Sequence, residues 1–493
     1  MADNDRLKTG VAGFDEVMNG GVPANYFYLL EGDPGAGKTT LALQFLFEGI
    51  RNGENVLYVT LSETKMELEA VARSHGWNLD QIPIYELFAE RGQLSPDDHY
   101  TVFHPSDVEL ADTAKTVLSE VEKINPSRLV IDSLAELRML AREPIIYRRQ
   151  ILAFKHHFEG RRCTVLLLDD RTGRSADMQL HSIVHGVITM EKIAREYGVT
   201  RRRLEATKMR GMQVREGFHD YVIRKGGLRV FPRLEASQHG KKFKIEPVPS
   251  GVRELDDLLG GGIDRGTSTL LVGPAGCGKS TVALQFAAAT SNRGERVCFF
   301  TFEESQQTFM ERAQGLKINL SAPLRENVLE VQQLDPAVLS PGEFVENVRS
   351  AVEERNARMV IIDSLNGFLQ AMPGEDFLTI QLHELLTFLN QQGVVTLMVL
   401  AQTGIVGAAM QSPVDVSYLA DAILLLRYYE AYGEVRQAIS VVKKRSGRHE
   451  RTIRELQLGS NGIRVGEPLR NFQGVLAGTP TFLGGTARDA AAD

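Results

Sequence analysis

The chain has 493 residues, of which 43% are hydrophobic and 24% are charged, and its formal net charge is −7 at pH 7. At roughly 100–200 residues per domain, this length predicts two or three domains. The acidic balance argues against a dedicated nucleic-acid binder, although Arg201-Arg202-Arg203 is a local basic run. No apolar run is long enough to cross a bilayer and no secretory signal is evident, so we expect a cytoplasmic protein without a membrane partner. The three cysteines, Cys163, Cys277 and Cys298, lack metal-ligand spacing and predict neither a zinc site nor a disulfide framework.

The first chemical feature along the chain is a phosphate-binding loop. The apolar run Tyr28-Leu29-Leu30 predicts a strand, an amphipathic run from Leu41 predicts a helix, and residues 32–39 between them satisfy the eight-position P-loop pattern. Its glycines let backbone N–H groups converge on phosphate oxygens, its lysine reaches the β- and γ-phosphates, and its hydroxyl ligates Mg²⁺. We therefore expect ATP at Gly32, Asp33, Pro34, Gly35, Ala36, Gly37, Lys38, Thr39 and Thr40.

Two carboxylates follow the next predicted strands, at residues 55–61 and 129–131. Asp132 ends the second of these strands, where it can hold Mg²⁺ together with Thr39 in the Walker B role. Glu63 follows the first strand and is the candidate carboxylate for ATP hydrolysis at this site. Because Ser62 precedes it, this half carries one carboxylate only, and we expect its ATP hydrolysis to be slow or absent.

A basic pair follows the predicted strands at residues 164–168 and 186–190. Lys208 and Arg210 lie on an alternating segment, so both point to one face of a strand. Cations presented in this way can reach the γ-phosphate of a neighbouring subunit, as arginine fingers do. The alternative is an ordinary exposed basic edge.

The second half of the chain repeats the first. Gly10 aligns with Gly251, Asp15 with Asp256, and the later motifs recur in the same order, which predicts two homologous domains. We place the domains at residues 1–235 and 249–475, with a flexible tail at 476–493. Residues 236–248 contain the polar run 237–242, which predicts a solvated linker between the domains.

The second half carries its own nucleotide site and its own carboxylates. Glu303 and Glu304 follow the predicted strand 297–302, which we expect to lie beside the P-loop strand. Adjacent carboxylates repel, which favours proton abstraction by one of them, so either residue can act as general base; a solvated strand end is the alternative. Asp363 and Ser280 repeat the metal ligands, Lys443 and Arg445 repeat the basic pair, and we expect ATP at Gly273, Pro274, Ala275, Gly276, Cys277, Gly278, Lys279, Ser280 and Thr281.

The fold class follows from the order of these elements. Short apolar strands alternate with helices in both halves, including the later strands at 359–362, 394–400 and 422–426. This pattern predicts an α/β fold with two mostly parallel sheets, each flanked by helices and each binding ligands at the carboxyl ends of its strands.

These motifs together resemble those of the KaiC-like circadian clock proteins, a double-domain branch of the RecA superfamily. The resemblance covers almost the whole chain and is carried by residues 9–15, 208–211, 250–256, 302–305 and 472–475. It implies two tandem RecA-like P-loop NTPase domains and a homo-hexameric double ring with ATP and Mg²⁺ at the subunit interfaces. It also implies that the N-terminal ring hydrolyses ATP, that the C-terminal ring phosphorylates itself, and that the phosphorylation state is passed to partner proteins.

The resemblance further implies phosphorylation sites at Ser417 and Tyr418. Ser417 keeps the serine of the family's adjacent acceptor pair, whereas Tyr418 stands where the family has threonine. In this scheme Glu303 or Glu304 takes the proton from a neighbour's Ser417. The alternative for Ser417 is a turn hydroxyl that binds nearby backbone.

Three functions remain to be distinguished. The first is an ATP-hydrolysing Ser/Thr autokinase that works as a clock-like switch. The second is a RecA- or RadA-like DNA-dependent ATPase, which would use the same loops and basic pairs on single-stranded DNA. The third makes the N-terminal domain a platform that binds ATP for assembly without hydrolysing it.

Overall fold

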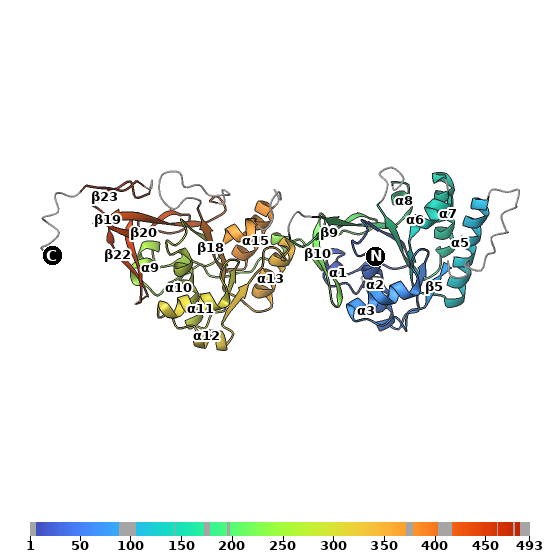
Figure 1. Cartoon of the computed structure of the whole chain (residues 1–493), viewed down its shortest axis with the longest axis horizontal. Coiled ribbons are helices and arrows are strands. Elements are labelled where there is room, and N and C mark those ends of the chain that lie inside the picture. The colour runs from blue at the N-terminus through green and yellow to red at the C-terminus, as the bar shows by residue number, and fades with distance from the viewer. Residues whose placement is uncertain are drawn as a thin grey trace. The chain divides into compact units, whose positions relative to one another are not determined.

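The computed structural model describes residues 6–87, 105–141, 143–171, 178–194, 198–370, 378–402, 417–460, 462–476 and 479–483. The chain forms two compact units, Met1–Arg233 and Leu234–Asp493, and each unit contains a nine-stranded sheet (Figure 1). The predicted α/β class and the tandem arrangement are confirmed.

In the first unit the sheet has the order β11-β10-β9-β8-β3-β7-β6-β4-β5. The strands from β8 to β5 run parallel, and β9, β10 and β11 extend the sheet in antiparallel fashion. Its strands are β3 (Phe27–Gly32), β4 (Val56–Thr60), β5 (Ile84–Glu86), β6 (Arg128–Asp132), β7 (Thr164–Asp170), β8 (Gly186–Ile193), β9 (Arg201–Met209), β10 (His219–Arg224) and β11 (Gly227–Phe231).

The second unit repeats this arrangement in the order β16-β15-β17-β18-β14-β19-β20-β21-β22, with the strands from β16 to β19 parallel. Its strands are β14 (Ser268–Gly273), β15 (Val297–Thr301), β16 (Leu329–Gln333), β17 (Met359–Asp363), β18 (Val395–Ala401), β19 (Ala422–Ala431), β20 (Glu434–Lys444), β21 (Arg454–Gly459) and β22 (Gly462–Pro468). Two-stranded pairs lie outside the large sheets: β1 (Arg6–Leu7) with β2 (Val22–Pro23), β12 (Pro247–Val248) with β13 (Ile263–Asp264), and β23 (Phe472–Gln473) with β24 (Thr481–Phe482).

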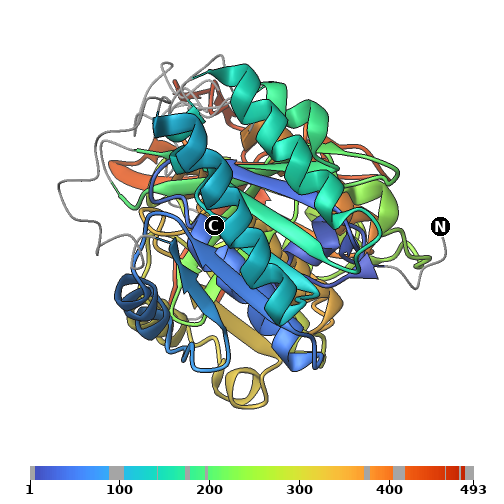
Figure 2. The same cartoon turned by 90° about the vertical axis from the view of Figure 1, so that its right-hand side faces the viewer.

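Helices cover both faces of each sheet. Figure 2 shows α5 and α7 side by side in front of the strands of the first unit. The first unit contains α1 (Phe14–Val17), α2 (Lys38–Arg51), α3 (Lys65–His75), α5 (Pro105–Ile124), α6 (Leu134–Ala141), α7 (Pro144–Phe158) and α8 (Met178–Ile183). The second contains α9 (Arg253–Leu259), α10 (Lys279–Asn292), α11 (Gln306–Gly315), α12 (Ser321–Arg325), α13 (Pro341–Glu353), α14 (Leu365–Gln370) and α15 (Leu378–Gln391).

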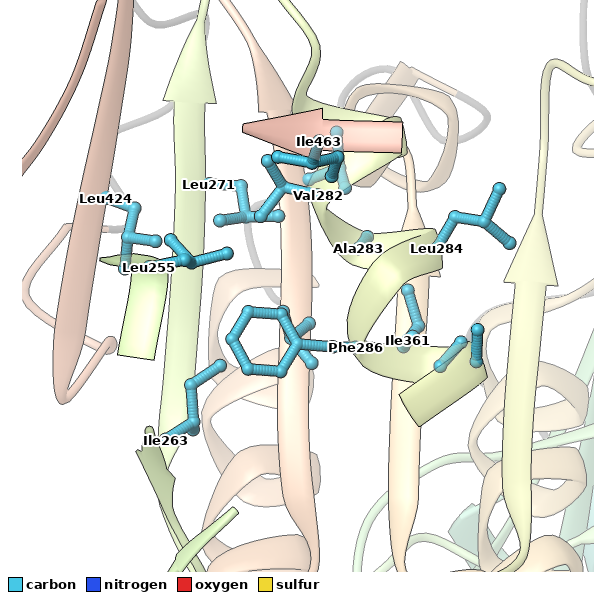
Figure 3. Packing of buried hydrophobic residues seen from close by; sticks show 14 of the residues in the cluster. Leu255, Ile263, Leu271, Val282, Ala283, Leu284, Phe286, Ile361, Leu424 and Ile463 are labelled. Atoms are coloured by element: carbon cyan, nitrogen blue, oxygen red, sulfur yellow. The ribbon is translucent and has the colours of Figure 1, made fainter. Parts of the chain in front are cut away.

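Alternation along the central strands divides each unit into two cores. In β14, Leu271 packs with Phe286 of α10, whereas its neighbour Leu270 packs with the core that contains Phe344 of α13 and Phe388 of α15. Figure 3 shows the first of these cores, with Phe286 pointing from α10 toward the strands. The continuous apolar runs of the sequence therefore form strands that are buried on both faces.

One predicted neighbour relation is wrong. Strand β15, which leads to Glu303, does not lie beside the P-loop strand β14, because β17 and β18 stand between them. After β14 the chain forms α10 and then enters the sheet again at β15, which is separated from β14 by two strands. Strand β17 later fills the position next to β15. The prediction failed because it assumed that consecutive strands pair, which holds for only about two-thirds of such strands.

The segment predicted as a solvated linker is only partly solvated. Ala236 is buried in a core of the second unit, and His239 makes a hydrogen bond of 2.8 Å with Glu353. Residues 240–245 are exposed. The predicted flexible tail lies mostly outside the described residues, but its residues Thr481–Phe482 form β24 and pair with β23.

A fully buried arginine joins the first sheet to its surroundings. Arg128, at the start of β6, forms two hydrogen bonds with the Glu54 carboxylate, at 2.6 and 3.1 Å, and donates to the carbonyls of Lys8 and Phe45. Its guanidinium also lies 4.8 Å from the centre of the Phe45 ring. Each of the three guanidinium nitrogens therefore donates a hydrogen bond, and a buried charge is tolerated only when it is paired and hydrogen-bonded in this way.

We expect Arg128→Ala to lower the free energy of unfolding of the first domain by about 3 kcal/mol, because it leaves Glu54 and two carbonyls without their donor. Urea denaturation followed by fluorescence measures this change, since the chain's single tryptophan, Trp77, lies in the first unit. Arg51→Ala is the control. Its pair with Glu48 is on the surface, so we expect a change within roughly 0.5 kcal/mol, and equal losses in both variants would contradict the assignment.

Candidate nucleotide sites

The first P-loop joins the carboxyl end of β3 to the start of α2. Gly37, the residue before the helix, has φ of 100°, and a side chain there would collide with Ile223 of β10. The Lys38 ammonium folds back over the loop and donates to the carbonyls of Gly32 (2.9 Å) and Asp33 (3.2 Å). It also forms an ion pair of 2.6 Å with Asp170 at the end of β7. The loop thus has the close backbone and the lysine that a triphosphate requires.

Asp132 lies next to this loop, at the carboxyl end of β6. Its Oδ2 accepts hydrogen bonds from Thr39 Oγ1 (3.3 Å) and from the Tyr58 hydroxyl (2.5 Å). Burial raises the pKa of Asp132, while the two hydrogen bonds and Lys38 act in the opposite direction. A hydroxyl and a carboxylate at this separation are oxygen ligands of the kind Mg²⁺ takes beside a bound nucleotide, so these two residues fit the predicted metal site.

Glu63 is held beside Asp132 by the turn that follows β4. The Thr60 hydroxyl donates to the Glu63 carbonyl (2.6 Å) and accepts from the Glu63 N–H (2.9 Å), and Thr60 is the register partner of Asp132. Oε2 of Glu63 is buried and has no hydrogen-bond partner. Burial, together with the charges of Asp132, Glu67 and Asp170, raises the pKa of this carboxyl to about 7. A carboxylate with such a pKa is suited to accept a proton near neutral pH.

The second P-loop repeats this geometry between β14 and α10. Gly278 has φ of 100°, and Lys279 donates to the carbonyl of Pro274 at 2.5 Å. Ser280 hydrogen-bonds Asp363 at the end of β17, and burial raises the pKa of Asp363 against the effect of that bond. Ser280 and Asp363 therefore fit a second metal site of the same kind as Thr39 and Asp132.

The two glutamates of the second domain have different environments. Oε1 of Glu303 accepts a hydrogen bond of 2.6 Å from Ser364, the residue after Asp363. Glu304 is bound by the guanidinium of Arg312 through Nε (3.0 Å) and Nη2 (2.5 Å). Arg312 compensates the charge of Glu304. The predicted repulsion between the adjacent carboxylates of Glu303 and Glu304 is therefore weakened by this ion pair. Glu303 therefore differs from Glu304 in having a neutral hydroxyl donor, on the residue next to Asp363, in place of a guanidinium.

The basic pairs do not lie with their own P-loops. Lys208 is opposite Val187 at the start of β8, and Lys443 is opposite Ile423 at the start of β19, so both lie near the amino edge of the parallel strands. The basic pairs therefore lie at the opposite edge of the sheet from the predicted ligand-binding edge. Lys208 and Arg210 donate to carbonyls of residues 181–184, in line with the prediction that both point to one side.

The predicted phosphoacceptors lie at this same amino edge. Ser417 and Tyr418 are exposed in the turn before β19, with 55% of Tyr418 accessible. Lys443 donates to the Ser417 carbonyl (2.9 Å), and Arg445 donates to the Tyr418 carbonyl (2.8 Å) and pairs with Asp421 (3.1 Å). The second basic pair therefore contacts the backbone of the two residues predicted as phosphoacceptors.

The first domain differs at the corresponding position. His185 precedes β8 where Asp421 precedes β19, and its ring stacks on Tyr26 with centroids 3.9 Å apart. The pKa of His185 is lowered, first by burial and then by the nearby charges of Arg210, Lys208 and Lys155. The ion pair between Arg445 and Asp421 is therefore not repeated in the first domain, because His185 stands at the position of Asp421.

The sequence reasoning missed four residues of the sites: Tyr58, Asp170, Arg312 and Ser364. Asp170 had a usable signal, because it ends an apolar strand, as Asp132 does. Tyr58 and Arg312 had none, since each acts from the interior of a strand or helix onto a motif residue. No cluster of three or more potential metal-binding residues of the His, Cys, Asp and Glu types occurs in the described ranges, and the three cysteines are free and buried. Among those residues no helix is long and apolar enough to cross a membrane.

Comparison with known proteins identifies relatives of the whole chain. A family model described as "ATPase: KaiC" matches residues 7–235 and 248–470, one match in each unit. Circadian clock protein KaiC3 of Synechocystis sp. is 28% identical over 487 residues, which cover 97% of this chain and 95% of the relative. Circadian clock oscillator protein KaiC of Thermostichus vulcanus is 27% identical (98% and 93% covered), and that of Synechococcus elongatus is 25% identical (97% and 92%).

The carboxyl of Glu63 generates a pH prediction. Only its ionised form accepts a proton, so we expect ATP hydrolysis at the first site to be low below pH 7 and to rise as the pH passes through about 7. Lys279→Ala isolates the first site for this measurement. Glu63→Gln should lower the rate by roughly 10²-fold or more and remove the pH step.

Two results would contradict this assignment. One is a pH step that persists in the Glu63→Gln variant. The other is a rate that this substitution leaves unchanged, which would mean that the first site binds ATP without using Glu63 to hydrolyse it. Thr64→Ala is the control, because it perturbs the neighbouring cap of α3 and leaves the carboxylate in place.

Proposed function

The chain belongs to the KaiC family of ATPases, and on that basis we propose that it is a homo-hexameric ATPase whose second domain phosphorylates a neighbouring copy of itself. Both P-loops bind MgATP in this proposal. The first domain hydrolyses ATP and supports assembly, and the second transfers phosphate to Ser417 or Tyr418. The phosphorylation state then serves as a signal to partner proteins, as in a clock-like switch; the clock role is what the names of the relatives suggest.

One observation carries the proposal of transfer between subunits. The acceptor turn lies beside the start of β14, since the Asp421 N–H donates to the Ser268 carbonyl, whereas the P-loop begins at Gly273 at the other end of that strand. At about 3.3 Å per residue these two ends are roughly 17 Å apart. A γ-phosphate bound by Lys279 therefore does not reach the Ser417 of the same chain, but a neighbour in a ring can bring its own turn to that phosphate.

The residues at the second site have separate roles in this transfer. Glu303 takes the proton from the acceptor hydroxyl, whose oxygen forms the new bond to the γ-phosphorus as the bond to ADP breaks. Glu304 is bound by Arg312 and helps to fix the strand end. Lys443 and Arg445 lie at the acceptor turn and stabilise the charge on the transferred group. Mg²⁺, when bound, neutralises charge on the phosphates.

The first domain uses one carboxylate for a simpler reaction. Glu63 orients and deprotonates the attacking water, while Lys208 and Arg210 reach the nucleotide of the neighbouring subunit. The counterpart of Ser417 in this domain is Ser182 of α8, whose carbonyl accepts a hydrogen bond from Arg210. This half of the chain therefore supplies ATP hydrolysis and subunit contact, and the other half supplies the kinase activity.

Mixing two inactive variants tests the transfer. Lys279→Ala cannot hold ATP in the second site but keeps its acceptors, and the double variant Ser417→Ala/Tyr418→Phe keeps the site but lacks the acceptors. With labelled ATP we expect no label at these positions in either variant alone, and label on the Lys279→Ala chain after the two are mixed. Mass spectrometry then locates the phosphate.

Two controls make the mixing experiment decisive. When the chain that carries Ser417→Ala/Tyr418→Phe also carries Glu303→Gln, mixing should leave the Lys279→Ala chain unlabelled. The wild-type chain should label itself. Label on Lys279→Ala alone would contradict the role of the second site. Absence of label at Ser417 and Tyr418 in the wild type would contradict the kinase proposal and leave the ATPase in place.

The alternative DNA-dependent motor predicts a different response. Single-stranded DNA should then stimulate ATP hydrolysis strongly, and the stimulation should fall steeply as salt rises. From the net charge of −7 and the family match we expect no stimulation. Measuring ATP turnover with and without a single-stranded oligonucleotide at 50 and at about 200 mM salt separates the two functions.

A further inference from the structure

The first nucleotide site contains an ion pair that the described residues of the second site do not repeat. Asp170 Oδ1 lies 2.6 Å from the Lys38 ammonium, and the two side chains are 34% and 9% exposed. Asp170 is the register partner of Gly32, the first residue of the P-loop, so it reaches the lysine from the adjacent strand β7. The carboxylate thus stands at the group that must receive the phosphates of ATP.

The second domain has alanine in the equivalent place. Ala401 is the register partner of Gly273, as Asp170 is of Gly32, and so it occupies the same position beside the second P-loop. Lys279 accordingly binds the Pro274 carbonyl at 2.5 Å and approaches the Cys277 sulfur at 3.8 Å. Within the described residues, no carboxylate pairs with Lys279.

The hydrogen bonds of the two lysines have a direct consequence for phosphate binding. An ammonium has three N–H donors, and those of Lys38 are matched by three acceptors, the carbonyls of Gly32 and Asp33 and the carboxylate of Asp170. A phosphate oxygen can bind Lys38 only if one acceptor is displaced. The displaced Asp170 then leaves a negative charge near the phosphates, which opposes their binding.

We propose that Asp170 is a positioning residue that holds Lys38 and competes with the phosphates of ATP, so that the first site binds ATP more weakly than the second. The inference rests on the proposed function of both loops as ATP sites. It extends that function by assigning to one residue the difference in affinity between two otherwise equivalent loops. The first domain would then respond to changes in ATP concentration at levels that already saturate the second.

The test uses single-site proteins made from the full chain. Lys279→Ala leaves the first site, Lys38→Ala leaves the second, and the dissociation constant of ATP is measured in each by calorimetry with Mg²⁺ present. In the first background we expect Asp170→Ala and Asp170→Asn to tighten ATP binding roughly tenfold, whereas Asp170→Glu keeps the weak binding. In the second background the reciprocal change Ala401→Asp should weaken ATP binding by a similar factor.

AMP separates competition for the lysine from a general change of the site. The P-loop lysine reaches the β- and γ-phosphates, which AMP lacks, so AMP binding should not change in any of these variants. Unchanged or weaker ATP binding in Asp170→Ala overturns the proposal, as does a lower turnover rate at unchanged affinity, which would mean that Asp170 acts on bound nucleotide. If Asp170→Ala does not fold, Ala401→Asp decides alone, and an unchanged affinity there overturns the proposal.

The same proteins distinguish this inference from the proposed function. If the double variant Lys38→Ala/Lys279→Ala binds ATP as the wild type does, the loops are not the ATP sites and the proposed function fails. If the double variant loses ATP binding and the Asp170 variants keep the ATP affinity of their Lys279→Ala parent, the loops are the ATP sites and only the role of Asp170 is rejected.

Discussion

Both domains depend on a buried aspartate at the carboxyl edge of a parallel sheet. Asp132 and Asp363 are 6% and 8% exposed, and an ionised carboxylate so deep in a protein is unfavourable unless it is hydrogen-bonded or bound to a cation. Each domain supplies a P-loop hydroxyl, from Thr39 or Ser280, and the first adds the Tyr58 hydroxyl. These bonds compensate only part of the burial, since the pKa of both carboxyls stays raised. A divalent cation bound beside the nucleotide would supply the remaining compensation, which would couple metal binding to the electrostatics of the fold at this position.

The sequence predicted the parts of these sites that act through local pattern. The P-loops, Asp132 and Asp363 were predictable because glycine spacing and a strand-ending aspartate are local features, and their strand and helix context lies within a few residues. The position of β15 was not predictable in this way, because strand order depends on crossover connections. The ion pair of Asp170 with Lys38 requires knowing that β7 lies beside β3, and the location of the basic pairs requires the antiparallel register of β9 and β20.

The two domains share a fold and differ in how they manage charge. Glu304 has Arg312 as its counter-ion, eight residues further along the chain, whereas the residue at the same spacing from Glu63 is Val71 of α3. Burial, followed by the charges of neighbouring carboxylates, raises the pKa of Glu63, and its Oε2 has no hydrogen-bond partner. The P-loop lysine of this domain pairs with Asp170. A duplicated chain can change the function of one copy by altering such pairs alone, because they lie at strand ends and helix surfaces and leave the apolar cores unaffected.

The separation of the two edges of the sheet gives a reason for assembly. Nucleotide loops and carboxylates lie at the carboxyl ends of the parallel strands, and the basic pairs with the acceptor turn lie at the amino ends, about 17 Å away along β14. In the proposed reaction the carboxyl edge supplies the nucleotide and the general base, and the amino edge supplies the acceptor and the cations, so the two edges must come from different copies of the chain. A copy that presented its amino edge to the carboxyl edge of the next would make a head-to-tail contact, and such contacts close a ring when the rotation between copies allows it. The chemistry inferred for the second domain therefore requires the oligomer.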